Sequence, residues 1–141
     1  ARFEILNETY VKKLQIEARI IGDMCLSQVI PAAVRYKNVL IENVKGLKKI
    51  FGDDYLSYCT SEMDALKAIS KYINNMSADI ELLVEARKKA NRIENLAQRA
   101  KVYSREVKDM MERVRESADN LEMLIDNEMW PLPKYRELLL F

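Results

Sequence analysis

Glycine and proline are scarce in this sequence, which has three of each in 141 residues. β-Sandwiches, barrels and glycine-rich phosphate loops need many turns, and turns depend on residues that adopt positive φ or on prolines of fixed φ. The scarcity therefore argues against all of these folds. With 49% hydrophobic and 32% charged residues, the chain is also unlike a disordered protein. These features together predict an all-α protein of one domain.

Apolar residues recur regularly through the first third of the chain, from Val11 to Phe51. Their mean step is about 3.6 residues, the repeat of an α-helix with one buried stripe, so we expect a helix over about residues 8–51. Gly52 follows this run, and glycine commonly ends helices because it adopts left-handed conformations. Pro31 lies inside the run, where it removes a backbone donor and crowds the preceding turn. It predicts a kink in the helix.

The second half of the chain has apolar residues spaced by seven, in two sets. The first set is Leu66, Ile73 and Ile80 together with Ile69, Met76, Leu83 and Ala90. The second set is Ile93, Ala100, Val107, Val114 and Leu121, partnered by Leu96, Tyr103, Met110 and Leu124. This spacing is typical of helices that pack in a left-handed supercoil. The two sets do not share a frame, and the polar stretch 87–92 separates them.

Two arrangements of this second half compete. One continuous helix over residues 61–127 would be about 100 Å long, and nothing in the chain could cover it. A chain that folds back near residues 87–95 instead has three helices that cover one another. We therefore predict an antiparallel bundle of three long helices in a single domain over residues 1–141. Its parts are helix 1 at about 8–51, a connector at 52–60, helix 2 at about 61–90, helix 3 at about 95–127, and a docking tail at 128–141 with an extended Trp-Pro-Leu-Pro stretch.

Candidate catalytic groups are few. The chain has no histidine, which excludes Ser-His-Asp and Cys-His nucleophile systems and imidazole metal ligands. Asp119, Glu122 and Asp126 share a helical face, but without Glu-x-x-His pairs a solvated face is favoured over a di-metal site. Cys25 and Cys59 are expected to be reduced, buried thiols. We predict no catalytic, cofactor-binding or metal-binding residue in this chain.

Charge and hydropathy restrict the partners. The chain has 23 basic and 22 acidic residues, and this balance gives no reason to expect binding to nucleic acid or to an anionic membrane. No stretch is apolar enough to span a membrane, and the first residues do not resemble a signal peptide. We expect a cytoplasmic protein. Because the sequence begins Ala1-Arg2-Phe3 without methionine, we also expect it to be a piece of a longer protein.

The end of the sequence differs from the helices before it. Trp130 is the only tryptophan, and Pro131 and Pro133 favour an extended stretch directly after it. Six of the last ten residues are apolar, so this segment needs a surface on which to bury itself. That surface is either this same bundle or a neighbouring domain or subunit, and the composition favours neither.

Two segments resemble a known family. Ile30-Pro31-Ala32-Ala33-Val34-Arg35-Tyr36, and the run Trp-Pro-Leu-Pro-Lys-Tyr-Arg-Glu-Leu-Leu over 130–139, resemble the C-terminal region of bacterial type III glutamine synthetases. The resemblance implies a parent protein that ligates ammonia to glutamate with ATP and divalent magnesium or manganese, and that forms a ring-shaped homo-oligomer. The catalytic motifs of that family precede this region. The resemblance therefore implies a non-catalytic C-terminal domain with a structural, assembly or regulatory role.

Within that role, we expect the domain to brace the catalytic domain of the same chain and neighbouring subunits. The residues expected to fix this docking are Arg35, Tyr36, Trp130, Pro131, Pro133 and Tyr135. Arg35 is expected to pair with a carboxylate near the end of the last helix, such as Asp126. The alternative function is an independent helical adaptor or oligomerisation module that binds partner helices.

Overall fold

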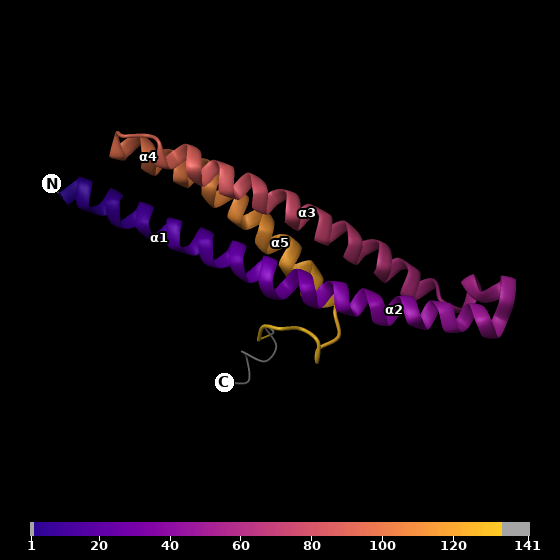
Figure 1. Cartoon of the computed structure of the whole chain (residues 1–141). Helices are drawn as coiled ribbons and strands as arrows, with labels where there is room; N and C mark the ends of the chain where they lie inside the picture. Colours follow the sequence, from indigo (N-terminus) through magenta and orange to yellow (C-terminus); the bar gives the residue numbers. More distant parts are fainter. Residues whose placement is uncertain (1, 134–141) are drawn as a thin grey trace.

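The computed structural model describes residues 2–133, and within this range it contains helices and no strand (Figure 1). The prediction of an all-α fold is confirmed. Residues 2–133 form three long helical stretches. The first comprises α1 (Arg2–Met24), a π-helical turn η1 (Cys25–Val29) and α2 (Ile30–Phe51). The second is α3 (Thr60–Asn91), and the third comprises α4 (Leu96–Val102), a π-helical turn η3 (Tyr103–Val107) and α5 (Lys108–Leu124).

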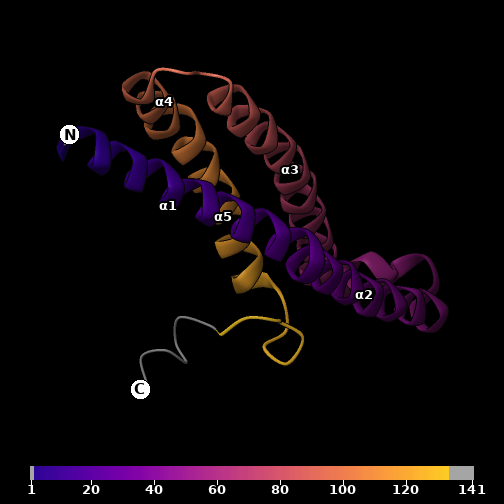
Figure 2. The same ribbon diagram turned by 60° about the vertical axis from the view of Figure 1, so that its left-hand side comes forward.

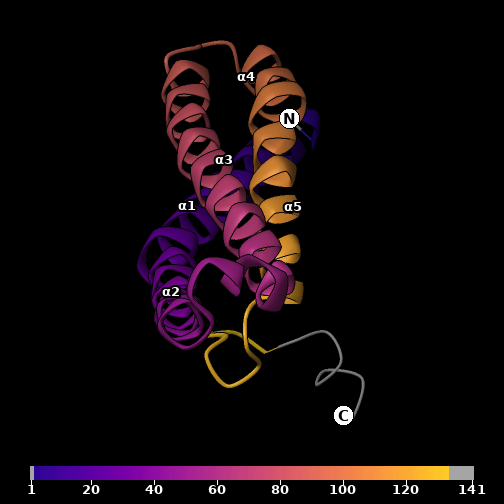
Figure 3. The same cartoon turned by 90° about the vertical axis from the view of Figure 1, so that its right-hand side faces the viewer.

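The first stretch forms a rod against which the other two lie (Figures 1 and 2). α3 packs along α5, α2 packs on α3, and α1 packs on α4 and α5. The start of α1 lies beside α4, whereas the junction of α1 and α2 lies near the end of α5 (Figure 2). The end of α2 and the start of α3 extend beyond α5 as a two-helix hairpin (Figure 1), and this hairpin faces the viewer in Figure 3.

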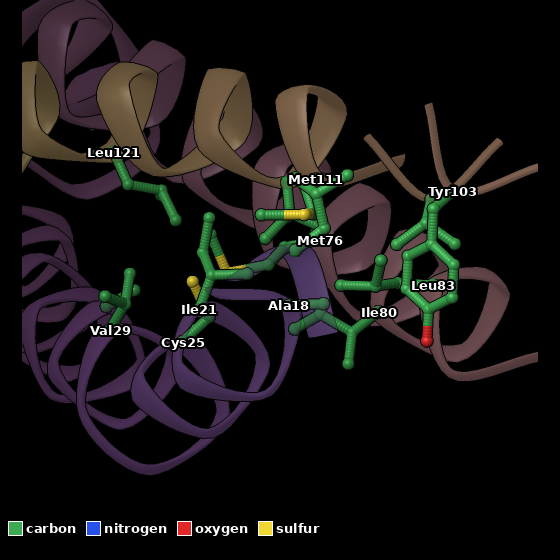
Figure 4. Close-up of a cluster of buried hydrophobic side chains, with 14 of the residues drawn as sticks. Ala18, Ile21, Cys25, Val29, Met76, Ile80, Leu83, Tyr103, Met111 and Leu121 are labelled. Carbon is green, nitrogen blue, oxygen red and sulfur yellow. The ribbon is translucent and has the colours of Figure 1, made fainter. Parts of the chain in front are cut away.

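The core consists of the residues that recur every seven positions, together with the apolar stripe of α1. Ile69, Met76, Leu83 and Ala90 of α3 are buried, and so are Ala100, Val107, Val114 and Leu121 of the third stretch. Figure 4 shows Ala18, Ile21 and Cys25 of the first stretch meeting Met76, Ile80 and Met111. Tyr103 is also fully buried, and its hydroxyl donates a hydrogen bond to the Asn91 side chain across the turn between α3 and α4.

Helical conformation continues through Pro31, which lies at the start of α2 directly after the π-helical turn. The turn is closed by the Ile30 N–H, which donates to the carbonyl of Cys25. A π-helical turn contains one more residue than an α-helical turn. This allows Cys25, Val29 and Ala33, which are spaced by four, to face the same core.

Short segments join the three stretches. Gly52 ends α2 with φ of +62°, in the left-handed region that glycine favours, and residues Gly52–Tyr58 form the 3₁₀ helix η2. The second turn covers residues 92–95. Asn95 caps α4, because its side-chain oxygen accepts a hydrogen bond from the Gln98 N–H at 3.0 Å.

Candidate docking surfaces

The beginning of the tail is anchored on the bundle itself. After α5 the backbone turns, with the N–H groups of Met129 and Trp130 both donating to the Asp126 carbonyl. Trp130 is only 8% exposed and belongs to the core. Its indole Nε1 is buried and has no hydrogen-bond partner among residues 2–133. Pro131 and Pro133 are exposed, so the tail alternates between groups that face the bundle and groups that face outward.

The other residues expected to dock lie apart from one another. Arg35 is exposed on α2, whereas Tyr36 is half-buried and packs against the core. No ion pair joins Arg35 to Asp126 among the described residues, and Asp126 Oδ1 instead accepts a hydrogen bond from the Glu128 N–H at 2.9 Å. Tyr135 lies outside the described residues.

The titratable groups of the bundle are mostly at its surface. Burial raises the pKa of the Asp119 carboxyl, and the neighbouring Glu122 carboxylate raises it further. Burial also raises the pKa of the Cys25 thiol to about 11, and Cys25 and Cys59 are both free thiols. Within residues 2–133, no three Cys, Asp or Glu side chains gather in a way that could hold a metal ion.

An apolar groove runs between α1 and α5, and we call it the α1–α5 groove. Its apolar lining comes from Ile20, Ile21 and Met24 of α1, Cys25 and Val29 of η1, and Ala118 of α5. Glu17, Arg115 and Asp119 are its charged residues, and Leu132 of the tail also lines it. The volume is about 340 Å³.

Exposed apolar side chains gather at both ends of the first stretch. At its start, Phe3, Ile5 and Leu6 are 67%, 64% and 61% exposed, and we call them the N-terminal patch. At the other end, Ile50, Phe51, Leu56 and Tyr58 are exposed on the projecting hairpin, and we call them the hairpin tip. The rings of Phe51 and Tyr58 stack with centroids 3.8 Å apart.

Sequence reasoning missed both of these patches. The helix was expected to begin near residue 8, but α1 begins at Arg2 and places Phe3, Ile5 and Leu6 on a helical surface. The available signal was their spacing: residues 3, 5 and 6 cannot all share the narrow stripe that α1 buries. Among the helices of residues 2–133, none has the length and apolar character needed to cross a membrane.

The chain is similar to known proteins over nearly its whole length. A family model described as the glutamine synthetase C-terminal domain matches residues 1–48. The chain is 40% identical to a glutamine synthetase of Bacteroides fragilis (strain YCH46) over 139 residues, which is 98% of the chain and 19% of that relative. It is 29% identical to a glutamine synthetase of Butyrivibrio fibrisolvens over 139 residues, and 26% identical to a type-3 glutamine synthetase of Dictyostelium discoideum over 140 residues.

In both of these further relatives, the match covers 99% of the chain and 19% of the relative. The chain thus spans about a fifth of the length of the curated relatives that it matches. The resemblance based on the Pro31 segment and the Trp-Pro-Leu-Pro run is therefore confirmed by matches that include the helices between them. The chain is thus similar to proteins of the glutamine synthetase family, and the part of that family matched by residues 1–48 is described as its C-terminal domain.

Proposed function

We propose that this chain is a non-catalytic domain of a type III glutamine synthetase, and that it braces the catalytic part of the enzyme within a homo-oligomer. The parent activity is the ATP-dependent ligation of ammonia to glutamate with divalent magnesium or manganese. The names of the relatives support this activity. About four-fifths of each relative lies outside the match, and this part is long enough to contain a catalytic domain.

The exposed N-terminal patch carries the proposal. Phe3, Ile5 and Leu6 contribute little to the bundle's own core, because more than 60% of each is exposed. Removing apolar surface from water is worth about 25 cal/mol per Å², so such a cluster is stabilising when another surface covers it. The catalytic domain of the parent enzyme is the partner that we assign to it.

The hairpin tip supports a second contact, with a neighbouring subunit. It lies at the opposite end of the rod from the N-terminal patch, and it also exposes apolar and aromatic side chains. Two separated patches on one rigid rod fit a brace between two bodies. An adaptor that acts on its own does not have to be part of a longer enzyme. This chain matches one segment of proteins about five times its length, so the matches favour the bracing domain.

The test uses two identical substitutions in the complete enzyme, Leu6→Glu in the N-terminal patch and Leu82→Glu on α3. Leu82 is 45% exposed and lies away from both patches, so it serves as the matched control. We expect Leu6→Glu to shorten the half-life of synthetase activity on heating about tenfold, equivalent to about 1.4 kcal/mol, and Leu82→Glu to leave it unchanged. In the isolated chain, neither change should shift the melting temperature.

Equal half-lives for the two variants would contradict the assignment of the N-terminal patch.

A separate assay addresses the absence of catalysis. The isolated 141-residue chain should form no γ-glutamyl hydroxamate and should show no saturable ATP binding. Saturable binding of ATP would overturn the non-catalytic role.

A further inference from the structure

Charges are segregated along the second half of the chain. Residues 85–108, which include the end of α3, the turn at 92–95 and α4, contain eight basic and three acidic residues. Residues 109–128, which include most of α5, contain two basic and seven acidic residues. The whole chain has a net charge of only +1, so the basic excess over residues 85–108 is local. We call this segment the basic end.

The order of these charges does not stabilise all of the helices that carry them. Lys88 and Lys89 lie in the last turn of α3, where the helix dipole favours basic residues. The dipole favours acidic residues at the start of α4, yet the first turn of α4 contains none, and Arg99 and Lys101 follow. The last turn of α5 contains Glu122 and no basic residue, which is also opposite to what the dipole favours. Stabilisation of their own helix therefore does not explain the basic residues of α4.

Few of the basic groups are neutralised within the bundle. Lys89 is the exception, because its Nζ lies 3.2 Å from Oε1 of Glu106. In the part of the chain that the structure describes, no other basic residue of the basic end forms an ion pair. Burial raises the pKa of the Tyr103 hydroxyl, whereas Arg87 on α3 and Arg99 on α4 act to lower it. Cations of both helices thus lie near the same hydroxyl, and an anion beside them would relieve their mutual repulsion.

The basic end lies beside the N-terminal patch. α1 packs on α4, and the start of α1 lies next to α4 (Figures 1 and 2). A body that covers the N-terminal patch therefore also reaches the basic end. α5 runs away from the turn at 92–95 (Figure 3), so most carboxylates of residues 109–128 are too far from the basic end to neutralise it.

We propose that the basic end docks on a carboxylate-rich surface of the catalytic part of the parent enzyme, next to the contact made by the N-terminal patch. This inference rests on the bracing role and adds the chemistry of the surface that is braced. Complementary charges beside an apolar contact fix the orientation of the partners and disfavour wrong ones. The N-terminal patch supplies buried apolar area, and the basic end sets the orientation.

Zero-length crosslinking of the complete enzyme with a carbodiimide tests the identity of the partner. The reagent joins lysine amines to carboxylates that touch them, and mass spectrometry of the peptides identifies each pair. Lys89 and Glu106 are the internal control, because they are in contact within the bundle. We expect Lys88 or Lys101, which are both exposed, to be joined to Asp or Glu residues outside this 141-residue chain.

Two results of the crosslinking would overturn the proposal. One is a crosslink between Lys89 and Glu106 with none from Lys88 or Lys101 to the rest of the enzyme, which is also the result expected if nucleic acid covers the basic end. The other is a crosslink from Lys88 or Lys101 to residues 109–128 of another copy, which would assign the basic end to a neighbouring C-terminal domain.

Charge reversal provides a second measurement. Lys101→Glu places an acidic residue near the start of the third helical stretch, which the helix dipole favours, so the melting temperature of the isolated chain should not fall. In the complete enzyme at low salt, the same change should shorten the half-life of synthetase activity on heating about fivefold. Salt at about 0.5 M should reduce this difference by screening. Lys67→Glu, at an exposed position of α3 outside the basic end, is the matched control and should leave the half-life unchanged.

The Leu6→Glu variant separates this inference from the bracing role. If Leu6→Glu shortens the half-life and Lys101→Glu does not, the brace is retained and the carboxylate-rich partner is wrong. If neither variant shortens it, the bracing role and this inference are both wrong.

Discussion

At the scale of single residues, one buried carboxylate links α3 to α5. The Asp79 side chain is 10% exposed, and its Oδ1 lies 3.1 Å from an Arg113 guanidinium nitrogen. Arg113 is 53% exposed, so its guanidinium remains largely in water. The two partners are therefore unequal: the arginine can be rehydrated if the pair is broken, whereas the aspartate stays in the helix interface.

This inequality predicts that the two partners respond differently to substitution. Arg113→Ala strands a buried carboxylate and should lower the free energy of unfolding by about 2 kcal/mol. Asp79→Asn keeps a polar group that can hydrogen-bond, so it should cost less than about 1 kcal/mol. Urea unfolding of both variants measures the difference. Arg105→Ala, at an exposed position on η3, is the control, and an effect as large as that of Arg113→Ala would contradict the prediction.

At the same scale, residue type predicts which side chains are buried, but it does not predict the surface on which they are buried. Trp130 was expected to bury itself, and it does so on its own bundle. Arg35 and Pro131 are exposed, but nothing in their chemistry distinguishes an outward contact from a solvated surface. A docking surface depends on which neighbours leave a side chain uncovered, and this is a property of the assembled fold rather than of the residue.

At the scale of elements, the spacings predict the helices and a fold-back near residues 87–95, and the turn between α3 and α4 lies inside that range, at residues 92–95. Spacings of seven identify buried residues directly, because helices in contact share that repeat. The turn at 92–95 contains neither glycine nor proline, so it lacks the usual breakers. The signal was Asn95 followed three residues later by Gln98, a pattern typical of a helix start.

The cap at this turn can be tested by removing its acceptor. Asn95→Ala takes away the oxygen that receives the Gln98 N–H and should lower the free energy of unfolding by about 1 kcal/mol. Asn95→Ser retains an acceptor and should be close to neutral. Chemical denaturation of the two variants makes the comparison. A neutral Asn95→Ala would show that the Arg99 Nε hydrogen bond to the Ile93 carbonyl is sufficient to hold the turn.

At the scale of the whole molecule, the first helical stretch sets the length. It runs from Arg2 to Phe51, and at 1.5 Å per residue it spans about 75 Å. The other two stretches lie within that length, since α3 folds back into α4 and α5.

Small-angle X-ray scattering of the isolated chain should therefore give a maximum dimension of about 80 Å. The turn at residues 92–95 limits this maximum dimension, because it folds α4 and α5 back along α3. If α3, α4 and α5 instead formed one continuous helix, the dimension would be near 100 Å or more. Light scattering on the same sample separates a long monomer from a larger assembly, and a value near 100 Å for a monomer would contradict the fold.

The two π-helical turns have a consequence for how sequences of this family can vary in length. Each turn holds one residue more than an α-helical turn, yet the buried stripe continues on both sides of it: Cys25, Val29 and Ala33 in one case, and Tyr103, Val107 and Met111 in the other. Loss of one residue inside Cys25–Val29 or Tyr103–Val107 would convert the turn to an ordinary α-helical one and leave the flanking segments in phase with the core. Loss of one residue elsewhere in the same helices would rotate everything after it by about 100°. Among relatives of this chain, single-residue gaps within the helices should therefore cluster at these two turns.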